Sequence, residues 1–138
     1  MNKHQPLVFV SLPVADLSKS IAFYEAIGFT HNKQFSDQTG ACMNLSDTFS
    51  VMLITHGKWR EFTTRAIPDA KKTAQLALII MLETKDAVIK AVENGAKAGG
   101  VADPNPIEDM GFMYGRSLED PDGHIVEPKW MDASAMNA

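Results

Sequence analysis

The sequence has only one cysteine, Cys42, so no disulfide can form within the chain. Its N-terminus has no charged segment followed by an apolar core of the kind that a secretory signal carries. The longest apolar run, residues 76–82, is much too short to span a bilayer. These absences predict a cytoplasmic protein that has no membrane partner.

Positive charge is also scarce. The chain has 13 Lys and Arg against 17 Asp and Glu, a net charge of -4, and its basic residues are scattered. Because a nucleic-acid surface needs a clustered basic face, we predict no nucleic-acid partner. A length of 138 residues suits one domain with a core and leaves little room for a second independent one. We therefore predict a single domain over residues 1–138.

The first half of the chain reads as strand, helix and three strands. In residues 7–14, Val and Leu side chains at every second position alternate with other residues, which is the pattern of a strand. Asp16 or Ser18 can cap the helix that follows, and Gly28 is placed to end it in a left-handed conformation. The three later extended segments are residues 30–35, 41–45 and 49–55.

The second half repeats this order after a polar connection over about residues 57–74, which is long enough to hold a short helix or a function. A strand over 75–83 precedes a helix that Thr84 caps and Gly95 ends. Extended segments follow at 100–102, 112–118 and 124–130. We predict an α+β fold in which two tandem βαβββ modules, about residues 5–56 and 75–131, form one cup-shaped mixed sheet with an open concave face for a ligand.

A tight turn is predicted at residues 120–123, because Pro121 presets its φ and Gly123 can adopt a positive φ. The strand after this turn alternates its side chains between two faces. Glu127 shares one face with Ile125 and Lys129. A carboxylate at this position of a half-buried strand needs an explanation.

Two motifs connect this arrangement to a known family. The first is Val14-Ala15-Asp16-Leu17 with Ser20, Ile21, Phe23 and Tyr24, and the second is Glu119 to His124 with Glu127. Together with the repeated βαβββ order, they resemble the vicinal oxygen chelate superfamily, which includes glyoxalase I, bleomycin-resistance proteins and extradiol dioxygenases. The resemblance covers essentially the whole chain.

The resemblance implies four inward-facing positions that hold a divalent ion in the metal-dependent members. In this chain they fall near Phe9, Leu53, Gln75 and Glu127. Only Glu127 is a strong match; Gln75 has a neutral oxygen, and Phe9 and Leu53 have no donor. A catalytic site normally needs about three protein ligands. We therefore expect no metal and no other cofactor. If a divalent ion is bound, Glu127, Gln75 and His56 are the candidate ligands.

Three roles remain open for Glu127. Its carboxylate pairs with a nearby base such as Lys129 or Arg116, or it orients a bound ligand, or it acts as a general base. Unchanged binding and activity in Glu127→Gln would reject the last two roles. Glu127 is thus the one candidate catalytic residue.

Aromatic and basic residues near the irregular segments are candidates for ligand binding. Trp59, Arg60 and Phe62 lie in the connection, and Tyr114 and Arg116 share a face of the penultimate strand with Phe112. Such residues suit a planar or anionic small molecule. The alternative is that Phe112 and Tyr114 belong to the core and that Trp59 packs the connection or a dimer contact.

The leading hypothesis is a family member that binds a small organic molecule in the cup without a complete metal site, as a binding or resistance protein or as an enzyme. The first alternative is a divalent-metal-dependent lyase of the glyoxalase type or an extradiol-type dioxygenase. The second is a scaffold without a ligand. The resemblance also implies a homodimer.

Overall fold

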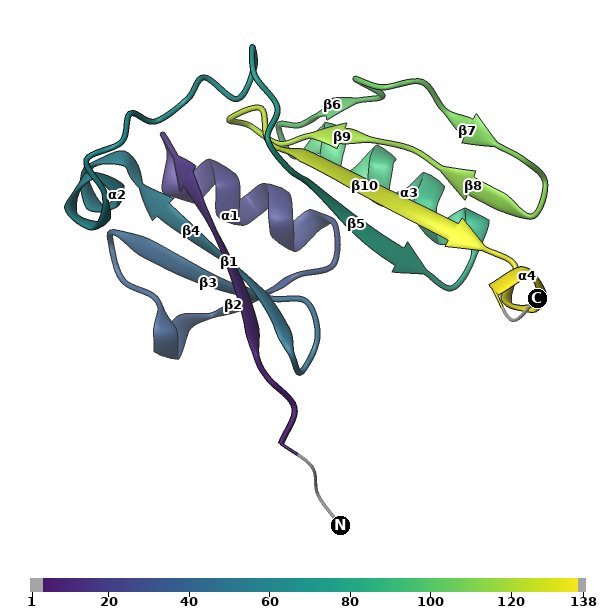
Figure 1. Cartoon of the computed structure of the whole chain (residues 1–138), viewed down its shortest axis with the longest axis horizontal. Coiled ribbons are helices and arrows are strands. Elements are labelled where there is room, and N and C mark those ends of the chain that lie inside the picture. Colours follow the sequence, from purple (N-terminus) through teal and green to yellow (C-terminus); the bar gives the residue numbers. More distant parts are fainter. Residues whose placement is uncertain (1–3, 137–138) are drawn as a thin grey trace. The chain divides into compact units, whose positions relative to one another are not determined.

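The computed structural model describes residues 4–136. Contacts between residues divide the chain into two compact units, Met1–Pro68 and Asp69–Ala138. Each unit contains a β-sheet and begins with a strand and a long helix, as predicted; within the described residues, three strands follow the helix in the first unit and five in the second (Figure 1). The predicted α+β class is therefore confirmed. None of the helices in residues 4–136 is both long and apolar enough to cross a membrane.

The first unit contains a four-stranded sheet with the strand order β1-β4-β3-β2. Strands β1 and β4 are parallel, and the other two pairs are antiparallel. Its elements are β1 (Val8–Val14), α1 (Leu17–Ala26), β2 (Thr30–Asn32), the 3-10 helix η1 (Lys33–Phe35), β3 (Gly40–Asn44), β4 (Phe49–Thr55) and α2 (His56–Phe62).

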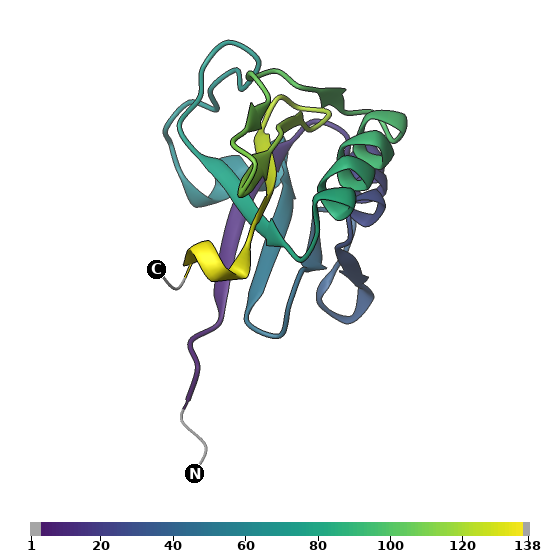
Figure 2. The same cartoon turned by 90° about the vertical axis from the view of Figure 1, so that its right-hand side faces the viewer.

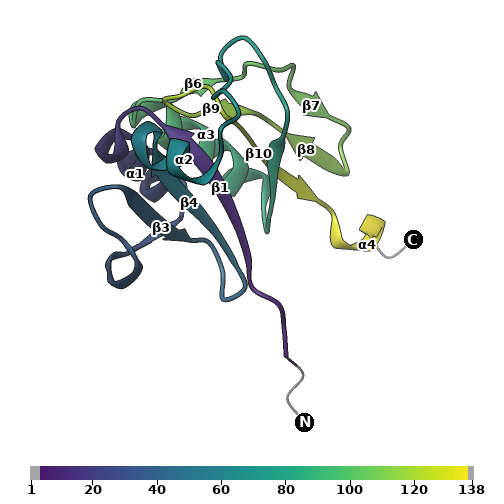
Figure 3. The same cartoon turned by 60° about the vertical axis from the view of Figure 1, so that its left-hand side comes forward.

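Helix α1 has both of its predicted ends. The Asp16 carboxylate accepts a hydrogen bond from the Lys19 amide at 3.2 Å, and Gly28 after the helix has a φ of 109°. The helix packs against β3 and β4 (Figure 3). Its Phe23 and Tyr24 rings are fully buried and meet edge to face with a centroid distance of 5.0 Å. One face of the first sheet is thereby covered.

The second unit contains β5 (Ala77–Leu82), α3 (Lys85–Lys97), β6 (Val101–Ala102), β7 (Glu108–Asp109), β8 (Met113–Gly115), β9 (Leu118–Glu119), β10 (Ile125–Met131) and α4 (Ala133–Met136). Strand β10 is parallel to β5 and antiparallel to β8 and β9. Strands β6 and β7 extend the sheet beyond β9 and β8. The single strand predicted over 112–118 is therefore two short strands, β8 and β9.

Helix α3 lies along one face of the second sheet (Figure 2) and buries Val88 and Val92. Thr84 caps it as predicted, because its hydroxyl accepts from the Ala87 amide at 3.0 Å. The predicted end at Gly95 is wrong. The helix continues to Lys97, with Gly95 buried inside it, and the positive φ of 102° belongs to Gly99. A glycine in a helix interior is tolerated, so its presence alone did not define the end.

The predicted turn at residues 120–123 is present, and Gly123 has a φ of 107°. The fully buried Asp120 carboxylate accepts hydrogen bonds from the amides of Asp122, Gly123 and His124, each at 2.9 Å. A Cβ at Gly123 would lie 2.7 Å from the backbone carbonyl carbon of Ala70. The turn therefore packs directly on the start of the segment that leads to β5.

The long connection holds the short helix that was one of its predicted alternatives. Helix α2 begins after Thr55, whose hydroxyl accepts from the Lys58 amide at 3.4 Å, and ends at Phe62. A tight turn follows at the start of the second unit, where the Asp69 carbonyl accepts from the Lys72 and Thr73 amides.

Candidate ligand-binding site

The face of the first sheet opposite α1 is its open face. Strand register places Phe9, Ser50 and Asn44 side by side in one row across this face. Ser11, Met52 and Cys42 form the next row. Because side chains alternate along a strand, their neighbours in sequence point to the face that α1 covers. We call these six residues the open face of the first sheet.

A cavity of about 560 Å³ lies on this open face, and we call it the first cavity. Its floor is formed by Cys42, Asn44, Ser50 and Met52, which come from the two central strands. Phe9 stands at the β1 edge, and Phe35 comes from η1, directly after the strand at the opposite edge. Both rings are more than half exposed, at 52% and 65%. The cavity is therefore a hollow across the sheet with an aromatic side chain at each edge.

The floor of the first cavity carries polar groups that already bind one another. The Asn44 side-chain amide donates to the Ser50 hydroxyl at 2.6 Å and to the Cys42 sulfur at 3.6 Å. Ser50 and Cys42 are only 5% and 2% exposed. These contacts fix the Asn44 side chain in the floor, where its amide group is a fixed polar group for a ligand.

The turn between β3 and β4 closes one end of the first cavity with Asp47 and Thr48. Asp47 is the one charged residue among the described residues of the lining. Within residues 4–136, its carboxylate has no hydrogen bond or ion pair. A ligand can therefore reach an uncompensated negative charge at this end.

A second cavity of about 310 Å³ shares Phe35 and Met52 with the first and extends toward α2, where it is lined by Lys58 and Phe62. The Lys58 ammonium lies 3.4 Å from the Glu61 carboxylate and 5.5 Å from the centroid of the Phe62 ring. The positive charge at this end is thus already paired.

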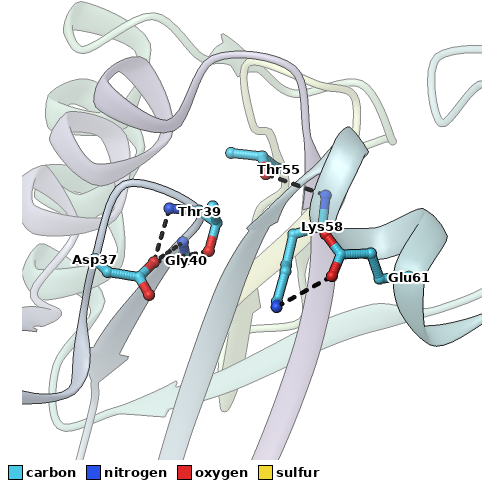
Figure 4. A network of polar contacts seen from close by, with 6 residues as sticks. All are labelled: Asp37, Thr39, Gly40, Thr55, Lys58 and Glu61. Carbon is cyan, nitrogen blue, oxygen red and sulfur yellow. Dashed lines mark hydrogen bonds and ion pairs between the residues drawn. The ribbon is translucent and has the colours of Figure 1, made fainter.

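Asp37 lies in the lining of the second cavity, and its contacts are drawn in Figure 4. One carboxylate oxygen accepts from the Thr39 amide at 2.7 Å, the Thr39 hydroxyl at 2.8 Å and the Gly40 amide at 3.1 Å. These hydrogen bonds, those of Thr39 first, hold the pKa of Asp37 below its ordinary value. The carboxylate therefore stabilises the turn before β3.

The open face of the second sheet carries Glu127 in a row of charges. The Lys129 ammonium lies 3.9 Å from the Glu127 carboxylate and 3.5 Å from that of Glu108. Gly115 makes room for the lysine, because a Cβ there would lie 3.2 Å from Lys129 Cγ. The structure thus pairs Glu127 with Lys129, one of the two partners proposed for it.

Arg116 was the other proposed partner of Glu127, and the structure places it elsewhere. Its guanidinium forms two hydrogen bonds with the Asp103 carboxylate, at 2.9 and 2.6 Å. This pairing raises the pKa of Arg116 above its usual value. Alternation puts Arg116 and Tyr114 on the helix-covered face of the second sheet, where Tyr114 is buried. Neither residue reaches the open face.

Gln75 lines a third cavity of about 430 Å³ in the second unit, together with Ala77 and Ile125. The Lys71 ammonium and the Glu119 carboxylate, 2.8 Å apart, also belong to its lining. Glu127 is not part of this lining. The cavity does not bring Gln75 and Glu127 together.

Leu53 is the clearest correction among the predicted site residues. It was expected on the same inward face as Phe9, but it is fully buried on the face that α1 covers. Met52 lies on the open face in its place, one residue earlier. Trp59 and Arg60 line none of the three cavities, whereas Phe62, from the same helix, lines the second.

Phe35, Asn44, Asp47, Ser50 and Met52 were missed by the sequence reasoning. Ser50 offered a signal, because it is the polar residue in a strand whose alternate positions Phe49, Val51 and Leu53 are apolar. Asp47 offered none, because it lies in the turn between β3 and β4, and Phe35 offered none, because it lies in the 3-10 helix η1 at the end of a segment that was predicted as extended over 30–35.

Two of the four implied metal positions lack a hard donor for a divalent ion. Phe9 has no donor atom, and Met52, which replaces Leu53 on the open face, has only a thioether, a soft ligand. His56 begins α2, in the first unit. Within the described part of the chain, residues 4–136, no three His, Cys, Asp or Glu side chains lie close enough together to hold a metal ion.

Comparison with known families identifies the class of protein. The model of the Glyoxalase/Bleomycin resistance protein/Dioxygenase superfamily matches residues 7–127, so the chain belongs to this superfamily. The resemblance drawn from the two sequence motifs is confirmed. A comparison with curated proteins found no significant match.

Solved structures of the same fold cover nearly the whole chain. A hypothetical protein from S. aureus is 25% identical, with a TM-score of 0.75 over 94% of this chain and 95% of that one. A glyoxalase-related enzyme from Fulvimarina pelagi is 22% identical, with a TM-score of 0.76 over 92% and 88%. A family enzyme from Burkholderia phytofirmans PsJN is 19% identical, with a TM-score of 0.73 over 92% and 99%. The latter two likenesses concern the fold alone.

Proposed function

We propose that this chain binds a small organic molecule in the first cavity, on the open face of the first sheet. The observation that carries the proposal is a 560 Å³ cavity with two largely exposed phenylalanines, Phe9 and Phe35, above a floor with hydrogen-bonding groups. Small-molecule sites are concave, mostly apolar and supplied with a few fixed polar groups. The volume lies within the range of such sites, about 300–1,000 Å³.

Binding is tested by following the methionine methyl groups of the protein by NMR while a library of small aromatic and aliphatic fragments is added. We expect at least one fragment to shift the Met52 methyl in a saturable way, because Met52 is part of the cavity floor. Met81 and Met113, in the second unit, report on non-specific binding. If no fragment shifts Met52, or if each hit shifts all three methyl groups equally, the proposal fails.

Two substitutions of exposed aromatic residues form a matched pair for this test. Phe9→Ala removes a wall of the first cavity, whereas Phe62→Ala removes an exposed ring of the same unit that lines the second cavity and not the first. For a fragment that shifts the Met52 methyl signal, we expect Phe9→Ala to weaken binding by about 1–2 kcal/mol, because apolar contact area is lost. Phe62→Ala should leave its affinity unchanged.

We further infer that this binding does not depend on a divalent ion held by the protein, because the open face of the first sheet offers only a thioether at the relevant strand position. The alternative is a metal-dependent lyase or dioxygenase in which Glu127, Gln75 and His56 are the ligands, and the open-face position of Glu127 favours it. Elemental analysis after incubation with zinc, nickel, manganese and ferrous iron decides between them. If the unaltered protein retains nearly one metal ion per chain and Glu127→Ala loses it, the inference of metal-independent binding is wrong.

A homodimer in the cytoplasm is also part of the proposal. Strand β5 pairs only with β10 among the described strands and carries two exposed apolar residues, Ile79 and Met81. Such surfaces are typical of protein contacts. Light scattering should give twice the chain mass of 15.1 kDa, and Ile79→Lys should shift it toward the monomer. A monomer in the unaltered protein would reject the dimer.

A further inference from the structure

The charge of the first cavity points to a class of ligand. Among the described residues 4–136, no lysine, arginine or histidine lines it, and Asp47 supplies the one formal charge. The Asp47 carboxylate has no hydrogen bond or ion pair within the described residues 4–136. An anionic ligand would therefore meet a repulsive charge and no cation.

The exposed rings supply the second observation, which does not depend on the charge. Phe9 and Phe35 are each more than half exposed, and no aromatic pair or cation–ring contact involves either of them among the described residues. The faces of aromatic rings attract cations, and rings of this kind recognise quaternary ammonium groups. Both rings are free to make such a contact.

We propose that the ligand of the first cavity is an organic cation, whose apolar body packs on Phe9 and Phe35 and whose ammonium group faces Asp47. The proposal rests on the function proposed above and names the class of ligand for the same cavity.

The neighbouring second cavity does not reverse this preference. Its Lys58 is paired with Glu61 and lies within the electrostatic influence of Asp37. The formal charges that line the two cavities within residues 4–136 are Asp47, Asp37 and Lys58, a sum of one negative charge. A cation that reaches from one cavity into the other therefore meets no net positive charge.

Three probes with the same ring and different charge test the inference. They are benzyltrimethylammonium, benzyl alcohol and phenylacetate, each titrated into the protein while the Met52 methyl signal is followed, with Met52→Leu used to assign that signal. We expect the ammonium compound to bind at least about tenfold more tightly than the alcohol, and phenylacetate to bind most weakly. The preference should decline with added salt, because exposed charges are screened.

Asp47→Asn isolates the carboxylate without removing its volume. We expect it to weaken the binding of benzyltrimethylammonium by up to about fivefold, the factor that one ion pair with an exposed carboxylate contributes. The affinity of benzyl alcohol should not change. Glu25→Gln is the matched control, because it removes the same charge from an exposed position on α1, outside the cavity lining. Thermal unfolding verifies that both variants are folded.

The outcomes separate this inference from the function on which it rests. If benzyl alcohol binds as tightly as the ammonium compound, or if Asp47→Asn has no more effect than Glu25→Gln, the cationic class is wrong while ligand binding stands. If none of the three probes shifts the Met52 signal but a neutral or anionic fragment does, the cationic class is again wrong while ligand binding stands. If neither the probes nor the fragment library shift Met52, the proposed function is wrong as well.

Discussion

Gly123→Ala tests whether the turn between β9 and β10 is held against the segment that leads to β5. Gly123 has a φ of 107°, which an L-amino acid adopts at a cost of about 1–2 kcal/mol. A Cβ would also lie 2.7 Å from both the Ala70 carbonyl carbon and the Lys71 nitrogen. Because these are backbone atoms, relief requires movement of a chain segment, and such overpacking costs about 1–3 kcal/mol. The expected loss of stability is therefore about 2–5 kcal/mol.

Gly99→Ala is the matched control, since Gly99 lies in the same unit and has a φ of 102°. The nearest atom to its Cβ would be Pro121 Cγ at an ordinary 3.8 Å, so only the backbone cost of about 1–2 kcal/mol applies. Urea unfolding followed by Trp130 fluorescence, in a Trp59→Phe background, reports on the second unit. Equal losses in the two variants would refute the close packing of the turn on Ala70 and Lys71.

Three further predictions concern polar groups. Arg116→Lys should lower the free energy of unfolding by about 1–2 kcal/mol in urea, because lysine cannot form both hydrogen bonds to Asp103, and an unchanged midpoint would contradict this. The pKa of the Asp37 carboxyl, measured by NMR, should lie below the ordinary 3.8, because the hydrogen bonds from Thr39 favour the charged form. The resulting stabilisation is complete above that value and is lost as the pH falls through the lowered pKa of the folded state; a pKa of 3.8 or higher would exclude it. Glu127→Gln should change stability by less than about 1 kcal/mol, because the Glu127 carboxylate lies 3.9 Å from Lys129, which keeps Glu108 as a partner at 3.5 Å, and a larger loss by thermal unfolding would show a stronger partner.

The ends of elements were predictable wherever one residue decides the backbone locally. Asp16 caps α1, Gly28 follows it with a positive φ, and Gly123 closes the turn before β10. Each depends on a property of a single residue, either a short side chain that accepts a backbone hydrogen bond or the absence of a Cβ. The repeat of helix and strands in the two halves was predictable because such capping and turn residues recur in the same order along both halves.

The face of a strand was harder to predict, and Leu53 illustrates why. Residues 51–54 are all apolar, so the pattern itself does not say which of them point to the helix. A shift of one residue exchanges the two faces completely. Val51 and Leu53 point to the helix because they are buried under α1, and this burial depends on contacts between residues that are distant in the sequence. Asp47 and Phe35 were beyond prediction because a turn brings the first to the cavity and the 3-10 helix η1 brings the second.

The two units each begin with a strand and a long helix followed by further strands, but they differ in the chemistry of their open faces. On the second sheet, Lys129 lies between Glu108 and Glu127, and Lys71 is paired with Glu119, so each of these charges has a partner within its own unit. On the first sheet, Asp47 has none within the described residues, and the adjoining walls are aromatic. A charged ligand must displace an existing ion pair to gain a contact on the second sheet, but not on the first. The uncompensated carboxylate therefore makes the first unit the better place to look for the ligand.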